Sequence, residues 1–499
     1  MTHRLSKSKI LSGIQCLKRL WLEVHKPDLL EYDQNSLARM SVGRKVGEIA
    51  CQYLAPGGVH VGLEEGFGRA LKLTREHLDS SDLPIYEATF VHDQVLVRTD
   101  IVLPAKSGLK VIEVKSSTSV KDYHIWDCAV QSWVLQGAAR PVRQVEVAVI
   151  DSSFVYPGEG NYQGLLRTED VTASVLEMQP QAEEWVRQCK NTLNGSMPDL
   201  SVGDHCRTPF ECPFWSVCDS GDGPEYPLTC LPYLRGRLRD ELAQEGFEDI
   251  RDIPQGRLSK PNHEWVRRVT FSGEPELLPG AAKVLNAHVY PRYFLDFETA
   301  QMVVPVWEGT RPYEQLPFQW SCHVEQTPGM ISHHEFLDIS GQPPMRWFAE
   351  SLLSTCGASG TIFVYGSFES RIINELIQRY PDLAGQLHSL SARIVDLLPI
   401  VRKHYYHPQM YGSWSIKAVL PCIAPDLDYS ALPGIHDGGQ AQEAYAEAVA
   451  PETTPERKEE LRNGLLAYCR MDTLALVRVV EVLSGNIASD NLSFKQRMS

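Results

Sequence analysis

The sequence lacks the features of a membrane or exported protein. Its 499 residues contain no run of about 18 or more uncharged apolar residues, which a membrane-spanning helix would need. The basic N-terminus is not followed by the apolar core of a signal peptide. Twelve cysteines are too few for a disulfide scaffold in a chain of this length. We therefore expect a cytoplasmic protein with no membrane partner, whose cysteines serve the core, a metal or a reactive site.

An excess of positive charge is also missing. The formal net charge is -15, which argues against a protein that coats nucleic acid through a basic surface. A local exception is the first 26 residues, where six basic residues accompany one acidic residue, Glu23. This basic stretch could contact phosphates, or it could be a solvated surface. Hydrophobic residues make up 43% and charged residues 22%, as in ordinary globular proteins.

Internal repeats and low-complexity tracts are absent, so the chain is expected to form successive distinct domains. Turn-forming residues concentrate at 219–227 and, less sharply, at 272–280. These breaks predict domains at 1–220 and 286–499, joined by a helical connector at 221–285. Strand and helix patterns occur in both outer segments, which predicts an α/β fold class.

The first group of chemically suggestive residues lies on a predicted β-hairpin, formed by 95–103 and 109–115. Asp100 and Glu113 fall on its two strands, and their carboxylates could share one Mg²⁺ or Mn²⁺ ion. Lys115 points to the same face as Glu113 because strand side chains alternate with period two. It could orient a water molecule or stabilise charge on a phosphate. The alternative is a surface hairpin with a polar face.

The order of these residues resembles the PD-(D/E)XK nucleases of the RecB type. Glu48 precedes the hairpin, and Gln131 follows it in a helix-like segment, 121–135. The resemblance implies a restriction-endonuclease-like fold for 1–220. It also implies that Asp100 and Glu113 bind the metal. The active site implied by the family contains Glu48, Asp100, Glu113, Lys115 and Gln131. Leu135 stands where the family often has tyrosine.

Four cysteines extend this resemblance. Cys206, Cys212 and Cys218 are separated by five residues each, and Cys16 lies 190 residues before Cys206. One distant cysteine and a C-terminal trio around a RecB-type domain resemble the iron-sulfur subgroup, which includes CRISPR-associated exonucleases. The resemblance implies a [4Fe-4S] cluster on these four thiolates. A zinc site and unrelated buried cysteines remain alternatives, since the spacing differs from the usual form.

A second group begins on a predicted strand, 293–299. Asp296 and Glu298 share one face of this strand, and adjacent carboxylates tend to recruit a divalent cation or shift their pKa. Glu369 follows another apolar strand, at the start of a predicted helix. Tyr468 and Asp472 are four residues apart on a later helix and so share a face.

Together these motifs resemble the DnaQ-like exonucleases of the DEDDy type, which have an RNase H-like fold. The resemblance implies that Asp296, Glu298 and Asp472 bind metal and that Tyr468 positions the attacking water. Glu369 occupies the place of a family aspartate, and Asp396 resembles an additional non-ligand acid. The chemistry implied is attack of water on a phosphodiester, with two metals stabilising the attacking and leaving oxygens.

The segment 405–417 is rich in aromatic residues and ends in Lys417. Such a segment could stack unpaired bases above a backbone contact. It could equally be a buried loop whose hydroxyl groups are satisfied internally.

The combined resemblance is to a bacterial fusion of the two nuclease types. It implies a Mg²⁺- or Mn²⁺-dependent deoxyribonuclease acting on single-stranded DNA or DNA ends in repair, recombination or defence, with a helicase or defence protein as a possible partner. Base specificity is not expected, because backbone chemistry needs positioning more than base readout. The alternatives are an RNA 3′ exonuclease, a nucleic-acid-binding assembly subunit with an inactive site, and an iron-sulfur redox sensor.

Overall fold

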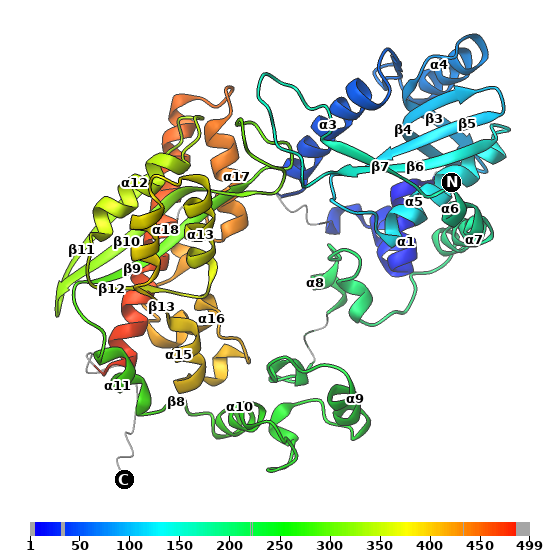
Figure 1. Cartoon of the computed structure of the whole chain (residues 1–499). Helices are drawn as coiled ribbons and strands as arrows, with labels where there is room; N and C mark the ends of the chain where they lie inside the picture. The colour runs from blue at the N-terminus through cyan, green and yellow to red at the C-terminus, as the bar shows by residue number, and fades with distance from the viewer. Residues whose placement is uncertain (1–4, 31–34, 220, 222, 433, 486–499) are drawn as a thin grey trace. The chain divides into compact units, whose positions relative to one another are not determined.

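The computed structural model describes residues 5–30, 35–219, 221, 223–432 and 434–485. The chain forms two compact units, each with a mixed α/β fold (Figure 1). The first unit contains residues 1–222 and 302–314, and the second contains 223–301 and 315–499. The predicted connector residues 223–285 belong to the second unit. Within the described part of the chain, no helix has the length and apolar character to cross a membrane.

A seven-stranded sheet forms the centre of the first unit. Its strand order is β2-β3-β4-β5-β6-β7, with β1 paired in parallel to β4. The adjacent strands β3, β4 and β5 are antiparallel, whereas β6 runs parallel to β5. The strands span Leu5–Ser6 (β1), Val59–His60 (β2), Ile85–His92 (β3), Val95–Ala105 (β4), Gly108–Val114 (β5), Val142–Ile150 (β6) and Leu166–Asp170 (β7).

Alternation along the strands places different residues on the two faces of this sheet. Val102 and Val111 pack into the core beneath helix α5, whereas Ile101 and Ile112 pack with Ala50 of helix α3. The helices of the unit are α1 (Lys7–Gln15), α2 (Leu17–His25), α3 (Asn35–Leu54), α4 (Phe67–Ser80), α5 (Asp122–Gly137), α6 (Thr172–Glu177), α7 (Gln179–Asn194) and α8 (Trp215–Cys218).

The segment 302–314 leaves the second unit between two of its strands and packs into the first unit. Val303, Val304 and Tyr313 contact a small core that contains Ile49 and Ile150. The backbone of residues 309 and 310 exchanges hydrogen bonds with Tyr156, at 2.9 Å each. The domain boundaries expected from the sequence did not include this insertion.

The second unit contains a five-stranded sheet in the order β11-β10-β9-β12-β13 (Figure 1). Strands β9, β10 and β11 are antiparallel neighbours, and β12 runs parallel to both β9 and β13. The strands span Arg292–Gln301 (β9), Gln315–Thr327 (β10), Met330–Leu337 (β11), Thr361–Val364 (β12) and Ile394–Asp396 (β13). A separate pair joins β8 (Glu276–Leu277) to β14 (Tyr405–Tyr406).

Two helices illustrate how the second sheet is covered. On β9, Phe297 packs edge-on against Phe348 of α12, while Asp296 lies beside Cys469 of α18. The acids at positions 296 and 298 therefore face α18, the long red helix in Figure 1. The helices of this unit are α9 (Arg237–Gln244), α10 (Pro261–Ser272), α11 (Gly280–Asn286), α12 (Met345–Cys356), α13 (Phe368–Arg379), α14 (Ala384–Ser391), α15 (Leu397–His404), α16 (Ile416–Ile423), α17 (Gly438–Val449) and α18 (Pro455–Leu483).

Candidate functional site

The first candidate site is built on strands β4 and β5. The Asp100 carboxylate accepts a hydrogen bond from the backbone N–H of Val114 at 2.6 Å, which ties β4 to the end of β5. Glu113 is almost fully buried, with 1% of its surface exposed. Burial, together with the negative charge of Glu113, raises the pKa of Asp100 to about 7. The two predicted metal ligands are therefore close enough to repel each other.

Two lysines compensate the charge of Glu113. Lys115 Nζ donates to Glu113 Oε1 at 2.6 Å, and Lys7 Nζ donates to the same oxygen at 2.8 Å. Burial opposes ionisation of Glu113, but the two ammonium groups outweigh it and hold the pKa of Glu113 well below its usual range. Lys115 also donates to Asp127 Oδ2 at 2.7 Å, and Lys7 lies 3.6 Å from that atom. The sequence predicted Lys115 here, but not Lys7 or Asp127.

Gln131 joins this site from helix α5. Its amide Nε2 donates to Glu113 Oε2 at 2.7 Å, while its Oε1 atom is buried without a hydrogen-bond partner. Asp127 lies one helical turn earlier and is therefore on the same face of α5. The structure thus brings Asp100, Glu113, Lys115 and Gln131 together, and the unsatisfied Gln131 oxygen leaves acceptor capacity in a buried place.

Glu48 does not join the first site, contrary to the sequence prediction. Its side chain is 62% exposed and lies 3.8 Å from Lys45 of the same helix. The reason is the position of α3, which packs on the sheet face that carries Ile101 and Ile112. Asp100 and Glu113 alternate with those residues and point to the opposite face.

The four cysteines singled out in the sequence line one small cavity, despite the large separation of Cys16 from the others in the chain. Phe214 and Trp215 contribute apolar walls to the cavity, and Lys18 and Arg19 bring positive charge to it. Burial raises the pKa of Cys212 and Cys218, and the positive side chains oppose this effect.

Helix α1 connects the cysteine cavity with the first site. It begins at Lys7, which contacts Glu113, and ends at Gln15, immediately before Cys16. The Gln15 amide donates to the backbone carbonyls of His205 at 2.8 Å and Phe210 at 2.6 Å. These two carbonyls flank Cys206, so the cysteine loop holds one end of the helix whose other end enters the first site.

The spacing of the cysteine sulfurs bears on which group they could hold. Tetrahedral zinc with bonds of about 2.3 Å places its sulfurs about 3.8 Å apart. Among the described residues, Asp296, Glu298 and Cys469 are the one group of three or more His, Cys, Asp or Glu donors whose ligand atoms all lie within 4.8 Å of one another. The four cysteines are not such a group, and their positions do not distinguish an iron-sulfur cluster from a zinc site.

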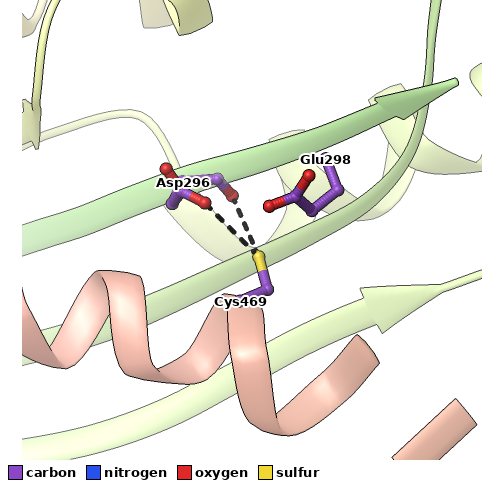
Figure 2. A group of neighbouring side chains, drawn as sticks. All are labelled: Asp296, Glu298 and Cys469. Carbon is purple, nitrogen blue, oxygen red and sulfur yellow. Dashed lines mark hydrogen bonds between the residues drawn. The ribbon is translucent and has the colours of Figure 1, made fainter. Parts of the chain in front are cut away.

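The second candidate site lies between strand β9 and helix α18. Figure 2 shows Asp296 and Glu298 projecting from β9 toward Cys469 of α18. Cys469 Sγ lies 3.6 Å from Asp296 Oδ2 and 3.8 Å from the Asp296 carbonyl oxygen. Burial and the neighbouring carboxylates raise the pKa of both Asp296 and Glu298 well above their usual values.

Two further acids complete this cluster. Glu369, the second residue of α13, has 3% of its surface exposed, and its Oε2 atom has no hydrogen-bond partner. Burial raises the pKa of Glu369 to about 8 and that of Asp472 to about 6. The charges of Glu369 and Asp472 both act on Asp296 and Glu298. The structure therefore brings together all four acids predicted for this site.

Aromatic and basic groups surround Asp472. Tyr468, one turn earlier on α18, is buried and interacts with the Asp472 carboxylate. Tyr429, which the sequence did not single out, donates to Asp472 Oδ1 at 2.6 Å. Lys417 Nζ lies 5.8 Å from the ring centres of both tyrosines. It thus presents a positive charge beside the acids, where it lowers the pKa of Glu298 and Asp472 against the effect of burial.

The structure also shows the surroundings of Asp396 and of the aromatic segment. Asp396 accepts hydrogen bonds from the backbone N–H groups of Leu398 and Gly366, so it caps helix α15, and its charge acts on Glu369. Tyr405, Tyr406 and Trp414 are buried in the core. These three rings are therefore not free to stack on bases, whereas Tyr411 of the same segment is 49% exposed.

Several residues of both sites were not predicted as site residues. Lys7 belongs to the basic stretch at 1–26, and no motif distinguishes it there; another member of that stretch, Arg4, lies outside the described residues. Asp127 shares a helix face with Gln131, so the spacing of four residues could have revealed it. Tyr429 and Cys469 follow no motif spacing, and only the folded chain brings them to the acids.

Comparisons with known proteins leave the function open. A family described as "Domain of unknown function (DUF2779)" matches residues 293–415, which include Asp296, Glu298 and Glu369. No curated protein matches the chain. A solved structure titled "Crystal structure of SSO0001" shares 13% sequence identity over 43% of this chain and 84% of its own. Its TM-score of 0.23 is too low to support a conclusion about fold or function.

Proposed function

We propose that the protein is a metal-dependent nuclease with two sites, which hydrolyse phosphodiester bonds with Mg²⁺ or Mn²⁺. The observation that carries this proposal is the convergence of Asp296, Glu298, Glu369 and Asp472 in one buried cluster. Burial raises the pKa of all four acids, and the charges of neighbouring acids add to this effect for Asp296, Glu298 and Glu369. A divalent cation would relieve that repulsion, and carboxylate oxygens are the ligands that Mg²⁺ and Mn²⁺ prefer.

The fold around these acids supports an RNase H-like domain of the DEDDy exonuclease type. Three antiparallel strands are followed by two parallel strands, and the central strand β9 carries two of the acids. The last acid comes from the C-terminal helix α18, with Tyr468 one turn before it. Glu369 stands where the family has aspartate, and its side chain still contributes to the cluster.

The first site supports a PD-(D/E)XK assignment for the first unit. Asp100, Glu113 and Lys115 meet at the ends of adjacent strands, and Gln131 reaches them from the following helix. Asp100 and Glu113 would hold the metal ion. Glu48 takes no part, so Asp100 and Glu113 lack the additional upstream residue that the family often has in its active site.

The cysteines support a [4Fe-4S] cluster in the first unit. Cys16, Cys206, Cys212 and Cys218 line one cavity, and four thiolates are the ligand set of such a cluster. When bound, the cluster would cross-link residue 16 to the loop at 206–218 and so stabilise α1 against the rest of the unit. Lys7 would then be held against Glu113.

The catalytic roles follow from the positions of the side chains. When bound, two metal ions would stabilise the attacking and leaving oxygens of the phosphodiester. Tyr468 lies beside Asp472, where its hydroxyl can orient the attacking water. Lys417 offers a positive charge to the phosphate in the second site, and Lys115 does so in the first. In these roles the groups would contact the sugar-phosphate backbone and not the bases, so we propose little base specificity.

We propose single-stranded DNA or DNA ends as the substrate, in repair, recombination or defence, with a helicase or defence protein as a partner. A cytoplasmic location is part of this proposal. RNA is the competing substrate, because the DEDDy resemblance includes RNA exonucleases. An assay that offers both nucleic acids to the protein distinguishes DNA from RNA as the substrate.

End-labelled single-stranded DNA and RNA, incubated with Mn²⁺, test the proposal. We expect Asp100→Ala and Asp296→Ala each to remove a different set of products, and the double variant to be inactive. Asp82→Asn and Glu452→Gln, which change exposed acids in the first and second unit, serve as controls and should match the wild type. A double variant with wild-type activity would overturn the proposal.

A further inference from the structure

The Cys469 thiol gives the second site a possible metal ligand that Mg²⁺ would not use. Its sulfur lies 3.6 Å from Asp296 Oδ2, and the ligand atoms of Asp296, Glu298 and Cys469 all lie within 4.8 Å of one another (Figure 2). The set combines two carboxylates with one thiol. Magnesium selects oxygen ligands, whereas zinc accepts both sulfur and carboxylate oxygen.

We propose that Asp296, Glu298 and Cys469 form a binding site for a thiophilic divalent cation such as Zn²⁺, which displaces the Mg²⁺ or Mn²⁺ of the second site and inhibits it. The proposal deepens the proposed function, since inhibition presupposes a working nuclease site. The binding of the cation itself does not depend on that function. Three protein ligands would leave a fourth zinc position for water.

The geometry agrees with this cation. Zinc–sulfur bonds of about 2.3 Å and zinc–oxygen bonds of about 2.1 Å at a tetrahedral angle separate sulfur and oxygen by about 3.6 Å. The Cys469–Asp296 distance has this value without any ion. In the metal-free protein the thiol donates its hydrogen to Asp296. When Zn²⁺ binds, that proton is released to solvent and the thiolate becomes a ligand, with no change of oxidation state.

A second observation points to a ligand in this place. Only 3% of the surface of Glu369 is exposed, and its Oε2 atom has no hydrogen-bond partner. Its charge acts on both Asp296 and Glu298, so it lies near the same cluster. A buried carboxylate oxygen without a donor is costly unless a cation satisfies it.

Cobalt provides a test that does not require nuclease activity. Co²⁺ substitutes for Zn²⁺ and shows a near-ultraviolet charge-transfer band when a thiolate binds it. The four cysteines of the first unit could also give such a band, so the measurement is the difference between variants. We expect Cys469→Ser to lose one component of the band, and Asp296→Asn to lose or weaken the same component. Cys422→Ser, a buried cysteine of the same unit, should keep it.

Inhibition of the Mn²⁺-dependent nuclease activity by zinc provides a second, functional test. Each variant is compared with its own rate in Mn²⁺ without zinc. We expect the zinc concentration for half-inhibition to rise roughly ten-fold or more in Cys469→Ser, as for the loss of an important metal-site group, and to stay unchanged in Cys422→Ser. A wild-type cobalt spectrum in Cys469→Ser would overturn the inference even if the protein is a nuclease. A missing Mn²⁺-dependent activity with an altered cobalt spectrum would instead overturn only the proposed function.

Discussion

The ammonium group of Lys7 lies 2.8 Å from Glu113 Oε1, although 106 residues separate the two in sequence. Lys7 is the first residue of α1, and Ser6, which caps this helix, belongs to a short strand that pairs with β4. The pairing of Ser6 with β4 and the start of α1 at Lys7 therefore fix the position of Lys7 together. Its charge lowers the pKa of both Asp100 and Glu113, so it favours the ionised form of these two carboxyl groups, the proposed metal ligands.

Replacing Lys7 by Met should weaken the first site. The substitution keeps a long side chain but leaves the buried Glu113 with one ammonium group instead of two. We expect products of the first site to form roughly 10²-fold more slowly, as when one charge-stabilising donor is removed, and the acid limb of the pH–rate profile to move to higher pH. Lys9→Met, on the same helix, is the control. An unshifted profile with normal activity would show that Lys7 is only structural.

Replacing Cys16 by Ser should affect the first site at a distance. The substitution removes one of the four cavity cysteines, and it acts next to Gln15, which fastens the end of α1 to the cysteine loop. We expect less iron per chain after anaerobic purification and a loss of first-site products, while products that depend on Asp296 persist. Iron analysis and end-labelled DNA digestion measure the two effects.

The control for this experiment is Cys51→Ser, which changes a cysteine that does not line the cavity. It should keep the wild-type iron content and product pattern. Equal iron in Cys16→Ser and the wild type would contradict the cluster assignment. Zinc in place of iron in the wild type would support the zinc alternative instead.

Local spacing made the ligand pairs predictable from the sequence. Period-two alternation placed Asp296 and Glu298 on one face, and it did the same for Glu113 and Lys115. The helical spacing of four joined Tyr468 to Asp472. Each of these pairs lies within one element, except that Lys115 follows the last residue of β5, and local backbone geometry determines which side chains share a face.

Contacts between distant elements could not be predicted in this way. Glu48 was assigned by its order in the chain, but α3 covers the other face of the sheet. Cys469 follows Tyr468 directly, and its role depends on how α18 packs against β9. The insertion of 302–314 into the first unit likewise depends on tertiary packing, since nothing in its composition distinguishes it from an ordinary hairpin loop.

The metal-free protein should lose stability as the pH rises from about 4 to about 8. Asp100, Asp472 and Glu369 have pKa values of about 7, 6 and 8 in the fold, against ordinary values of 3.8 to 4.5. In this window the native state holds protons that the unfolded chain has released, so each increase in pH favours unfolding. We expect a melting temperature in EDTA that falls by several degrees, since 1 kcal/mol corresponds to roughly 2–4 °C in domains of about 150–250 residues.

Calorimetry with and without Mn²⁺ checks this expectation. Bound Mn²⁺ should flatten the decline, because the cation replaces the protons that the acids hold. Glu369→Gln should reduce the decline in EDTA, as it removes one titrating group, whereas Glu459→Gln at an exposed position of α18 should not. A melting temperature that rises with pH in EDTA would mean that these carboxylates are ionised without metal.

Tyr429 should tune the ionisation of Asp472, while Tyr468 should act on the reaction itself. The Tyr429 hydroxyl donates to Asp472 Oδ1 at 2.6 Å, and this hydrogen bond lowers the pKa of Asp472 against the effect of burial. A hydrogen bond to a charged group contributes about 1.5–3 kcal/mol, and one pKa unit corresponds to about 1.4 kcal/mol. Tyr429→Phe should therefore move the acid limb of the second-site pH–rate profile upward by roughly one unit or more, with normal rates regained at higher pH. Tyr468→Phe should lower the rate at every pH, because the attacking water then lacks the hydroxyl that orients it. Recovery of the Tyr468→Phe rate at high pH would mean that Tyr468, like Tyr429, acts only through Asp472.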